Sequence, residues 1–234
     1  MSAALAIFAK TKGLSPVKTR LAADIGTDLA EAFYDLSVAA TAEMALATQQ
    51  QSHNAVEPYW ALAESHAIDA PQWQMLNTLW TGDGDFGLRL HRVYSTLLTT
   101  HEQVVLIGTD SPQLEPERIT SALLQLKMQL KMQPKTCVIG PCVDGGFYLF
   151  AANTAIPQSV WTQVTYSSES TLRELVSNLK NVGMAVVLLA SDGDVDTADD
   201  LKPLMQALQL KHGLRPQQQR LYDWLTEQPA CLKS

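Results

Sequence analysis

Short runs of apolar residues recur along the chain, and each is followed by glycine, proline or charged residues. Such runs are typical of strands in a sheet that is covered on both faces. We expect strands at 3–9, 104–108, 137–140, 147–151 and 184–190. The pattern at 56–63 also predicts a strand, which Pro58 weakens because proline cannot donate a hydrogen bond within a sheet. The pattern at 71–80 is ambiguous.

Between these runs, apolar residues recur every three to four positions, which is the spacing of an amphipathic helix. We expect helices at 27–49, 87–98, 115–132, 168–181, 198–210 and 216–226. Strands that alternate with helices predict an α/β fold with a mostly parallel central sheet and helices on both faces. A length of 234 residues suits one domain over 1–234, with a C-terminal helical segment at about 211–234.

The composition narrows the class of protein. A content of 46% hydrophobic and 18% charged residues argues against disorder, and a net charge of −7 argues against broad nucleic-acid binding. The three cysteines show no C-x-x-C spacing, so we expect neither disulfides nor a zinc ribbon, and a cytoplasmic location fits. We expect no membrane span, and 3–9 has no basic region before it that would indicate a signal peptide.

Ligands of open α/β sheets bind beyond the carboxyl ends of the strands, so the residues that follow each strand are candidates. After 3–9 comes KTKGLSPVKTRL, a basic loop around Gly13. Its amide groups and cations can bind phosphates, although it is not a Walker A loop. In an extended loop, Lys18 and Arg20 would both face one ligand. The alternative is a solvated basic loop without a ligand.

Two aspartates follow other strands. Asp110 comes after 104–108 and precedes Ser111-Pro112, a position that suits Mg²⁺ or Mn²⁺, although an N-cap or turn aspartate is the alternative. Asp144 comes after 137–140 and precedes two glycines, which allow a tight turn or close approach to a ligand. An ordinary hairpin turn is the alternative. Either way, we expect Asp144 at the same end of the sheet as Asp110.

The acidic segment after 184–190 superficially suggests an EF-hand. That pattern fails, because glycine is missing from its sixth position and glutamate from its twelfth. Thr197 and Asp200 instead predict a capping box at the start of the next helix. This leaves Asp196 outside the helix, where it is free to meet a metal ion held by Asp110.

The segment 82–87 matches G-x-G-x-x-G, but it is a weak dinucleotide signal. No convincing strand precedes it, and Asp83 and Asp85 would repel a pyrophosphate. We favour a loop over the base or sugar of a nucleotide, in which Gly87 and Arg89 begin the next helix.

Together these segments resemble the motifs of one family. FAKTKGLSPVKTRLAADIG, GDGDFGLRL, VVLIGTDSPQL, GPCVDGGFYLF and DVDTADDL are similar to those of bacterial GT-A-like glycosyltransferases, a nucleotide-diphospho-sugar transferase family once grouped as a domain of unknown function. Some members are named for a proposed role in arsenosugar biosynthesis. The basic loop and DVDTADDL are also similar to cytidylyl- and guanylyltransferases of molybdopterin cofactors and to phospholactate or phosphoenolpyruvate guanylyltransferases.

The resemblance runs to about Leu204 and implies the GT-A fold, a nucleotide site at 10–20, and a metal ion on Asp110 and Asp196. One departure is Phe147, where relatives commonly have tyrosine, which leaves the choice of acceptor open. The expected contacts of the nucleotide and its phosphates are Lys10, Gly13, Lys18, Arg20, Gly87 and Arg89.

Three functions follow from these features. The first is glycosyl transfer from a nucleotide-sugar to a small acceptor, with Mg²⁺ or Mn²⁺ on Asp110 and Asp196 and with Asp144 positioning or deprotonating the acceptor hydroxyl. The second is nucleotidyl transfer from a nucleoside triphosphate to a phosphorylated acceptor, with release of pyrophosphate. The third is a non-catalytic nucleotide-binding protein. The sequence leaves the oligomeric state open.

Overall fold

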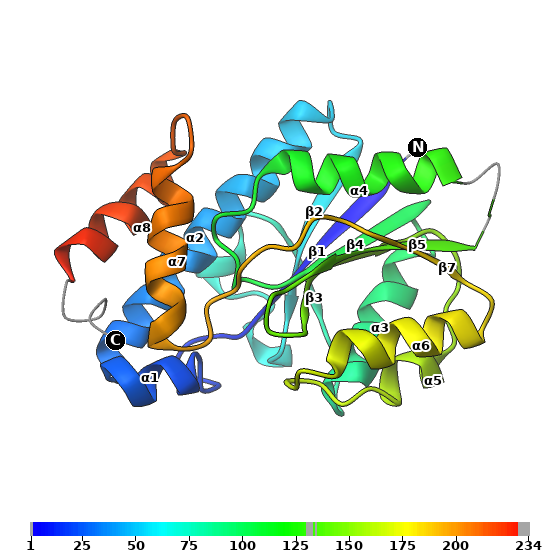
Figure 1. Cartoon of the computed structure of the whole chain (residues 1–234), viewed down its shortest axis with the longest axis horizontal. Helices are drawn as coiled ribbons and strands as arrows, with labels where there is room; N and C mark the ends of the chain where they lie inside the picture. Colours follow the sequence, from blue (N-terminus) through cyan, green and yellow to red (C-terminus); the bar gives the residue numbers. More distant parts are fainter. Residues whose placement is uncertain (1, 130–132, 134, 229–234) are drawn as a thin grey trace.

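The computed structural model describes residues 2–129, 133 and 135–228, and its centre is a seven-stranded sheet with the order β3-β2-β1-β4-β6-β5-β7 (Figure 1). The strands are β1 (Ala3–Ala9), β2 (Val56–Leu62), β3 (Asn77–Trp80), β4 (Gln103–Ile107), β5 (Thr136–Pro141), β6 (Phe147–Ala152) and β7 (Ala185–Leu188). Only β6 is antiparallel to its neighbours, β4 and β5, and the remaining pairs are parallel. The predicted mostly parallel sheet is confirmed.

Helices cover both faces of the sheet (Figure 1). One face carries α2 (Thr27–Gln51) and α4 (Pro116–Gln129), and the other carries α3 (Phe86–Leu97), α5 (Gln158–Thr162) and α6 (Thr171–Asn181). Alternate residues of β1 explain how the two cores differ. Leu5 and Ile7 enter one core, whereas the small residues Ala4 and Ala6 enter the other, which leaves room for aromatic rings such as Trp161.

A third core lies beside the sheet. It joins α1 (Thr19–Ile25), α7 (Leu201–Gln209) and α8 (Pro216–Glu227) to the first turns of α2, through buried side chains that include Leu21, Phe33 and Leu221. The capping box predicted at Thr197 and Asp200 is present at the short 3-10 turn that leads into α7. None of the described helices is both long and apolar enough to cross a membrane.

The sequence pattern failed at short elements and at the edge of the sheet. Strand β3 precedes the glycine pattern at 82–87, so the expectation that no strand precedes it is wrong. All four residues of β3 are at least partly exposed because it is an edge strand, and it therefore has no buried apolar run. Neither α1 nor α5 was expected. The predicted helix 115–132 is described as far as Gln129, and its residues 130–132 lie outside the described residues, as do residues 229–234 of the predicted C-terminal segment.

Candidate functional site

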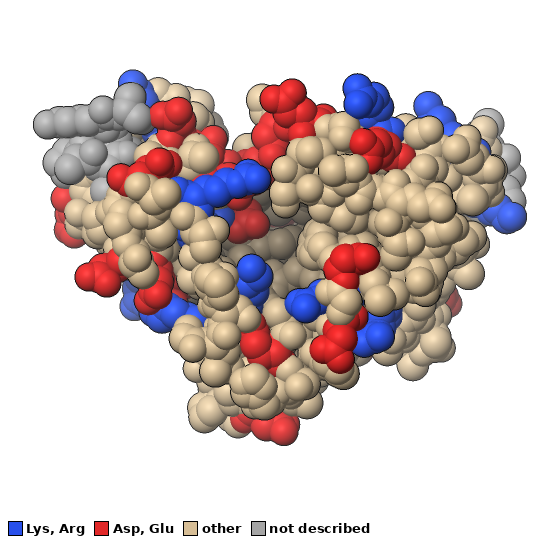
Figure 2. Space-filling model, turned by 90° about the horizontal axis from the view of Figure 1, so that it is seen from below, with Lys and Arg blue, Asp and Glu red and all other residues tan. Residues whose placement is uncertain are grey.

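A cleft lies at the carboxyl ends of the strands and consists of two adjoining cavities of about 360 and 570 Å³. Figure 2, seen from below relative to Figure 1, shows a hollowed face with basic and acidic side chains around the hollow. Residues that line both cavities include Phe8, Lys10, Phe86, Arg89, Asp110 and Asp196. The cleft therefore has a smaller and a larger half that share one boundary.

Lys18 lies at the start of α1 in the left-handed region, with φ 45° and ψ 43°. A residue other than glycine in this region is strained, and such strain clusters at functional sites. Its side chain is only 5% exposed, and its ammonium group pairs with Asp110 and donates a hydrogen bond to the carbonyl oxygen of Val195. The same nitrogen lies 5.6 Å from the centre of the Phe33 ring. Lys18 is thus a buried cation beside Asp110, and it does not share an extended loop with Arg20 as expected.

The other predicted cations are more exposed. Arg20 lies in the first turn of α1 and pairs with Asp196 at 3.2 Å, and the two side chains are 57% and 43% exposed, so solvent weakens the pair. The Arg89 Nε atom donates to the carbonyl oxygen of Gly84 at 3.0 Å. Lys10 lies at the end of β1, and its Nζ atom donates to the carbonyl oxygen of Pro16 at 3.3 Å. Arg20, Arg89 and Lys10 all line the smaller cavity.

The two glycines that the sequence predicts as nucleotide contacts lie outside the cleft. Neither Gly13 nor Gly87 is among the residues that line the two cavities. A Cβ atom at Gly13 would meet no other atom within 4 Å, as expected of an open loop. Gly87 is buried, and a Cβ atom there would lie 2.4 Å from the carbonyl oxygen of Trp161. The structure therefore gives Gly87 a packing role between α3 and α5.

Four carboxylates gather where the two halves meet. Burial, followed by the charges of Asp144, Asp196 and Asp110, raises the pKa of Asp194 to about 6. Burial and the charge of Asp110 likewise raise the pKa of Asp196 above its ordinary value. Asp144 and Asp194 line the larger cavity, whereas Asp110 and Asp196 line both. The expected proximity of Asp144 to Asp110 is therefore observed.

Asp144 also has the turn role that the sequence left open. Its Oδ1 atom accepts a hydrogen bond of 2.8 Å from the backbone nitrogen of Gly146, two residues later. The hydrogen bond fixes the direction of the carboxylate, which still lines the larger cavity. The turn and a role in the site are therefore compatible.

Asp194 was missed from the sequence. The signal was present, because Asp192, Asp194 and Asp196 alternate along an extended segment, and alternate residues of such a segment point to one side.

The donor set fits a hard divalent cation. Carboxylate oxygens are the ligands that Mg²⁺ and Mn²⁺ prefer, and a cation would relieve the mutual repulsion that raises the pKa values of Asp194 and Asp196. Possible ligand atoms of Cys142, Asp144 and Asp194 lie within 4.8 Å of one another. Burial and the neighbouring carboxylates raise the pKa of the Cys142 thiol, so it stays protonated beside them.

Aromatic rings line the larger cavity. Phe8 and Phe86 meet edge to face at 5.8 Å between ring centres, and Phe86 and Tyr166 meet in the same way at 5.1 Å. Phe86 is 45% exposed, and Trp80 is the only other exposed phenylalanine, tyrosine or tryptophan of the described chain. Phe147 also lines this cavity and offers a ring without a hydroxyl. The larger half is therefore both acidic and aromatic.

Comparisons with solved structures identify the fold. A protein of Desulfovibrio desulfuricans G20, with a proposed assignment as a nucleotide-diphospho-sugar transferase, is 23% identical with a TM-score of 0.82, over 100% of this chain and 98% of that one. A CMP:2-keto-3-deoxy-manno-octonic acid synthetase complexed with CTP is 15% identical with a TM-score of 0.50, and the match covers 90% of this chain and 100% of that one. A 4-diphosphocytidyl-2C-methyl-D-erythritol synthase of Anaerococcus prevotii is 11% identical with a TM-score of 0.50, and the match covers 88% of this chain and 94% of that one.

One of two sequence comparisons identifies the family. The chain matches none of the curated proteins with which it was compared. Residues 45–168, which are more than half of the chain, match the family described as uncharacterized protein conserved in bacteria (DUF2064). The chain belongs to this DUF2064 family, and its fold is the GT-A fold of the nucleotide-diphospho-sugar transferases.

Proposed function

We propose that the protein is a metal-dependent transferase that moves a glycosyl group from a nucleotide-sugar to a hydroxyl group of a small acceptor. The observation that carries the proposal is the unequal distribution of charge between the two halves of the cleft. The fold, which this chain shares with a synthetase complexed with CTP and with a proposed nucleotide-diphospho-sugar transferase, supports the use of a nucleotide donor.

The smaller half suits the diphosphate of the donor. Four cationic side chains line it, namely Lys10, Lys18, Arg20 and Arg89. Charged donors of this kind form strong hydrogen bonds with phosphate oxygens. Lys18 is already paired with Asp110, so we expect Lys10, Arg20 and Arg89 to make the first contacts with the phosphates.

The larger half suits an uncharged acceptor. Its only cations among the lining residues are Lys10 and Arg89, which it shares with the smaller half, whereas Asp144 and Asp194 belong to it alone. A phosphorylated acceptor would be repelled by these carboxylates, but a hydroxyl group would not. The charge distribution therefore favours glycosyl transfer over nucleotidyl transfer to a phosphorylated acceptor.

Each residue then has a defined task. Asp110 and Asp196 would hold Mg²⁺ or Mn²⁺, with Asp194 beside them, and the bound ion would neutralise the charge of the departing nucleoside diphosphate. Asp144, which the Gly146 amide holds in place, would orient the acceptor hydroxyl and accept its proton. The aromatic wall of Phe8, Phe86 and Tyr166 would exclude water from the larger half.

The test is the identity of the released product. The protein is incubated with Mn²⁺, a panel of nucleotide-sugars and nucleoside triphosphates, and small alcohols or sugars as acceptors. We expect release of a nucleoside diphosphate from a nucleotide-sugar. Release of pyrophosphate from a nucleoside triphosphate would contradict glycosyl transfer and support the second function. Metal-dependent nucleotide binding without either product would support a non-catalytic binding protein.

A further inference from the structure

Two loops carry the acidic residues of the cleft, and they approach from different parts of the chain. The first follows β4 and contains Asp110, and the second follows β7 and contains Asp194 and Asp196. One backbone hydrogen bond joins them directly, from the Val195 nitrogen to the Asp110 oxygen at 2.9 Å. The Lys18 ammonium group joins the same two residues, because it pairs with Asp110 and donates to the carbonyl oxygen of Val195. Both links meet at Asp110 and Val195, so a link at another point is needed to stop one loop from pivoting on the other.

Gln113 supplies this link. Its side chain is 6% exposed, and its Nε2 atom donates to Asp192 Oδ1 at 2.8 Å and to the carbonyl oxygen of Gly193 at 2.6 Å. Gln113 lies three residues after Asp110, and Gly193 lies one residue before Asp194. The amide group thus connects the two acidic loops at a second point. Both of its hydrogen bonds use the amide hydrogens, so a side chain without donors cannot replace it.

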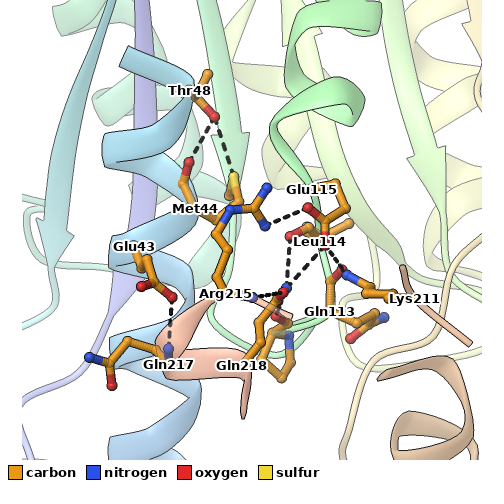
Figure 3. A network of polar contacts seen from close by, with 11 residues as sticks. Glu43, Met44, Thr48, Gln113, Leu114, Glu115, Lys211, Arg215, Gln217 and Gln218 are labelled. Atoms are coloured by element: carbon orange, nitrogen blue, oxygen red, sulfur yellow. Dashed lines mark hydrogen bonds and ion pairs between the residues drawn. The ribbon is translucent and has the colours of Figure 1, made fainter. Parts of the chain in front are cut away.

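Helix α8 and the segment before it bond to the loop that contains Asp110 (Figure 3). Gln218 of α8 is fully buried, and its Nε2 atom donates to the carbonyl oxygens of Pro112 and Leu114 at 3.1 and 3.4 Å. Lys211 donates to the carbonyl oxygen of Gln113. These contacts tie the loop that carries Asp110 to helix α8 and to the segment before it.

Glu115 strengthens the same support. It pairs with both Lys211 and Arg215, as Figure 3 shows. Burial alone would raise the pKa of Glu115, but hydrogen bonds and charges from Lys211 and Arg215 outweigh burial and lower it. The carboxylate is therefore ionised at neutral pH, and the network keeps its full charge.

The geometry points to Gln113 as a positioning residue that fixes Asp194 and Asp196 relative to Asp110, with Gln218 of α8 fixing the loop that carries Gln113. The inference rests on the proposed function, because the positioned carboxylates are those of the proposed metal site. It gives the C-terminal helices a part in cation binding, although neither helix lines the cleft. Residues that orient metal ligands in this way typically contribute about 10–100-fold to metal affinity.

The test is a calorimetric titration with Mn²⁺ alone, carried out on the full chain below the unfolding temperature of every variant. We expect Gln113→Met to weaken Mn²⁺ binding by about 10–100-fold while the protein stays folded, because methionine keeps the volume but has no donor. We expect Gln218→Met to weaken Mn²⁺ binding as well. Gln219→Met is the matched control, since Gln219 is exposed on the same helix and its side chain bonds only to Asp223 within the described chain.

Exchanging the amide of Gln113 and the carboxylate of Asp192 separates a loss of loop position from a general loss of stability. Gln113→Glu places a carboxylate opposite Asp192 and should weaken Mn²⁺ binding at least as much as methionine does. Adding Asp192→Asn restores a donor opposite the new acceptor and should recover part of the affinity. If Gln113→Met binds Mn²⁺ as tightly as the parent, or if the double variant recovers nothing, the positioning role is wrong and the proposed function stands. If the parent itself binds no Mn²⁺, the proposed function is wrong, and the positioning role falls with it.

Discussion

The substitution Asp194→Asn tests the crowding of carboxylates in the cleft. Asparagine has nearly the same shape as aspartate but no charge. In the folded protein, burial and the neighbouring carboxylates hold the proton on Asp194 up to about pH 6. In the unfolded chain the proton leaves near pH 4. Ionisation of Asp194 therefore opposes folding, with a cost that is absent below about pH 4 and complete above about pH 6.

The size of this cost follows from the raised pKa. A difference of about two pH units corresponds to about 3 kcal/mol if it is fully transmitted. The side chain is partly exposed, so solvent screening reduces the cost to about 1 kcal/mol. For a chain of this length, that shifts the melting temperature by about 2–4 °C. We therefore expect Asp194→Asn to melt about 2–4 °C above the parent at pH 7.5 without metal.

The assay is thermal unfolding of parent and variant between pH 4 and pH 7.5, with a chelator and then with Mn²⁺. The advantage of the variant should shrink as the pH falls through 6 and vanish near 4. Saturation of the parent at a hundredfold its dissociation constant adds about 2.7 kcal/mol, which should reverse the order of the two proteins at pH 7.5. A variant that is less stable than the parent without metal, or equally stabilised by Mn²⁺, would refute this reasoning.

Three further predictions address single positions. Asp110→Asn should leave a folded protein whose nucleotide binding no longer depends on Mn²⁺, and unchanged metal dependence in a calorimetric titration would remove Asp110 from the metal site. Asp144→Asn should keep donor and metal affinity while transfer falls by about 10²–10⁴-fold, whereas unchanged transfer in the product assay would leave it a turn residue. Gly87→Ala should destabilise the fold by about 1–3 kcal/mol through the clash with Trp161 and leave donor affinity unchanged in the folded protein. Lost donor affinity at an unchanged melting temperature would instead support a phosphate-binding role for Gly87.

The sequence was informative where burial is complete. Strands β1 and β4 are buried almost throughout, so their apolar runs predicted them directly. The rule that ligands lie beyond the carboxyl ends of strands then led to Asp110 and Asp144. Edge strand β3 escaped because its four residues, Asn77–Trp80, begin with two polar side chains and hold no apolar run, whereas the similarly exposed edge strand β7 keeps the run AVVL and was predicted.

The sequence was uninformative where a residue's role depends on a distant partner. Lys18 reads as one of several basic loop residues, and its burial depends on Val195, which lies 177 positions later. Gln218 reads as one of three consecutive glutamines at the start of a helix, and only the packing of α8 buries this one against the loop after β4. Local patterns carry no signal for either contact.

The antiparallel direction of β6 has a consequence for divergence within the family. Because β5 and β6 are joined by a turn and not by a crossover helix, only residues 142–146 separate them. Val143 at this turn is 83% exposed, so residues inserted there would extend into solvent without shifting the register of either strand. The same turn holds Asp144 in the larger half of the cleft. If the larger half binds the acceptor as proposed, changes at this turn would alter acceptor specificity while the smaller half of the cleft and the sheet stay as they are.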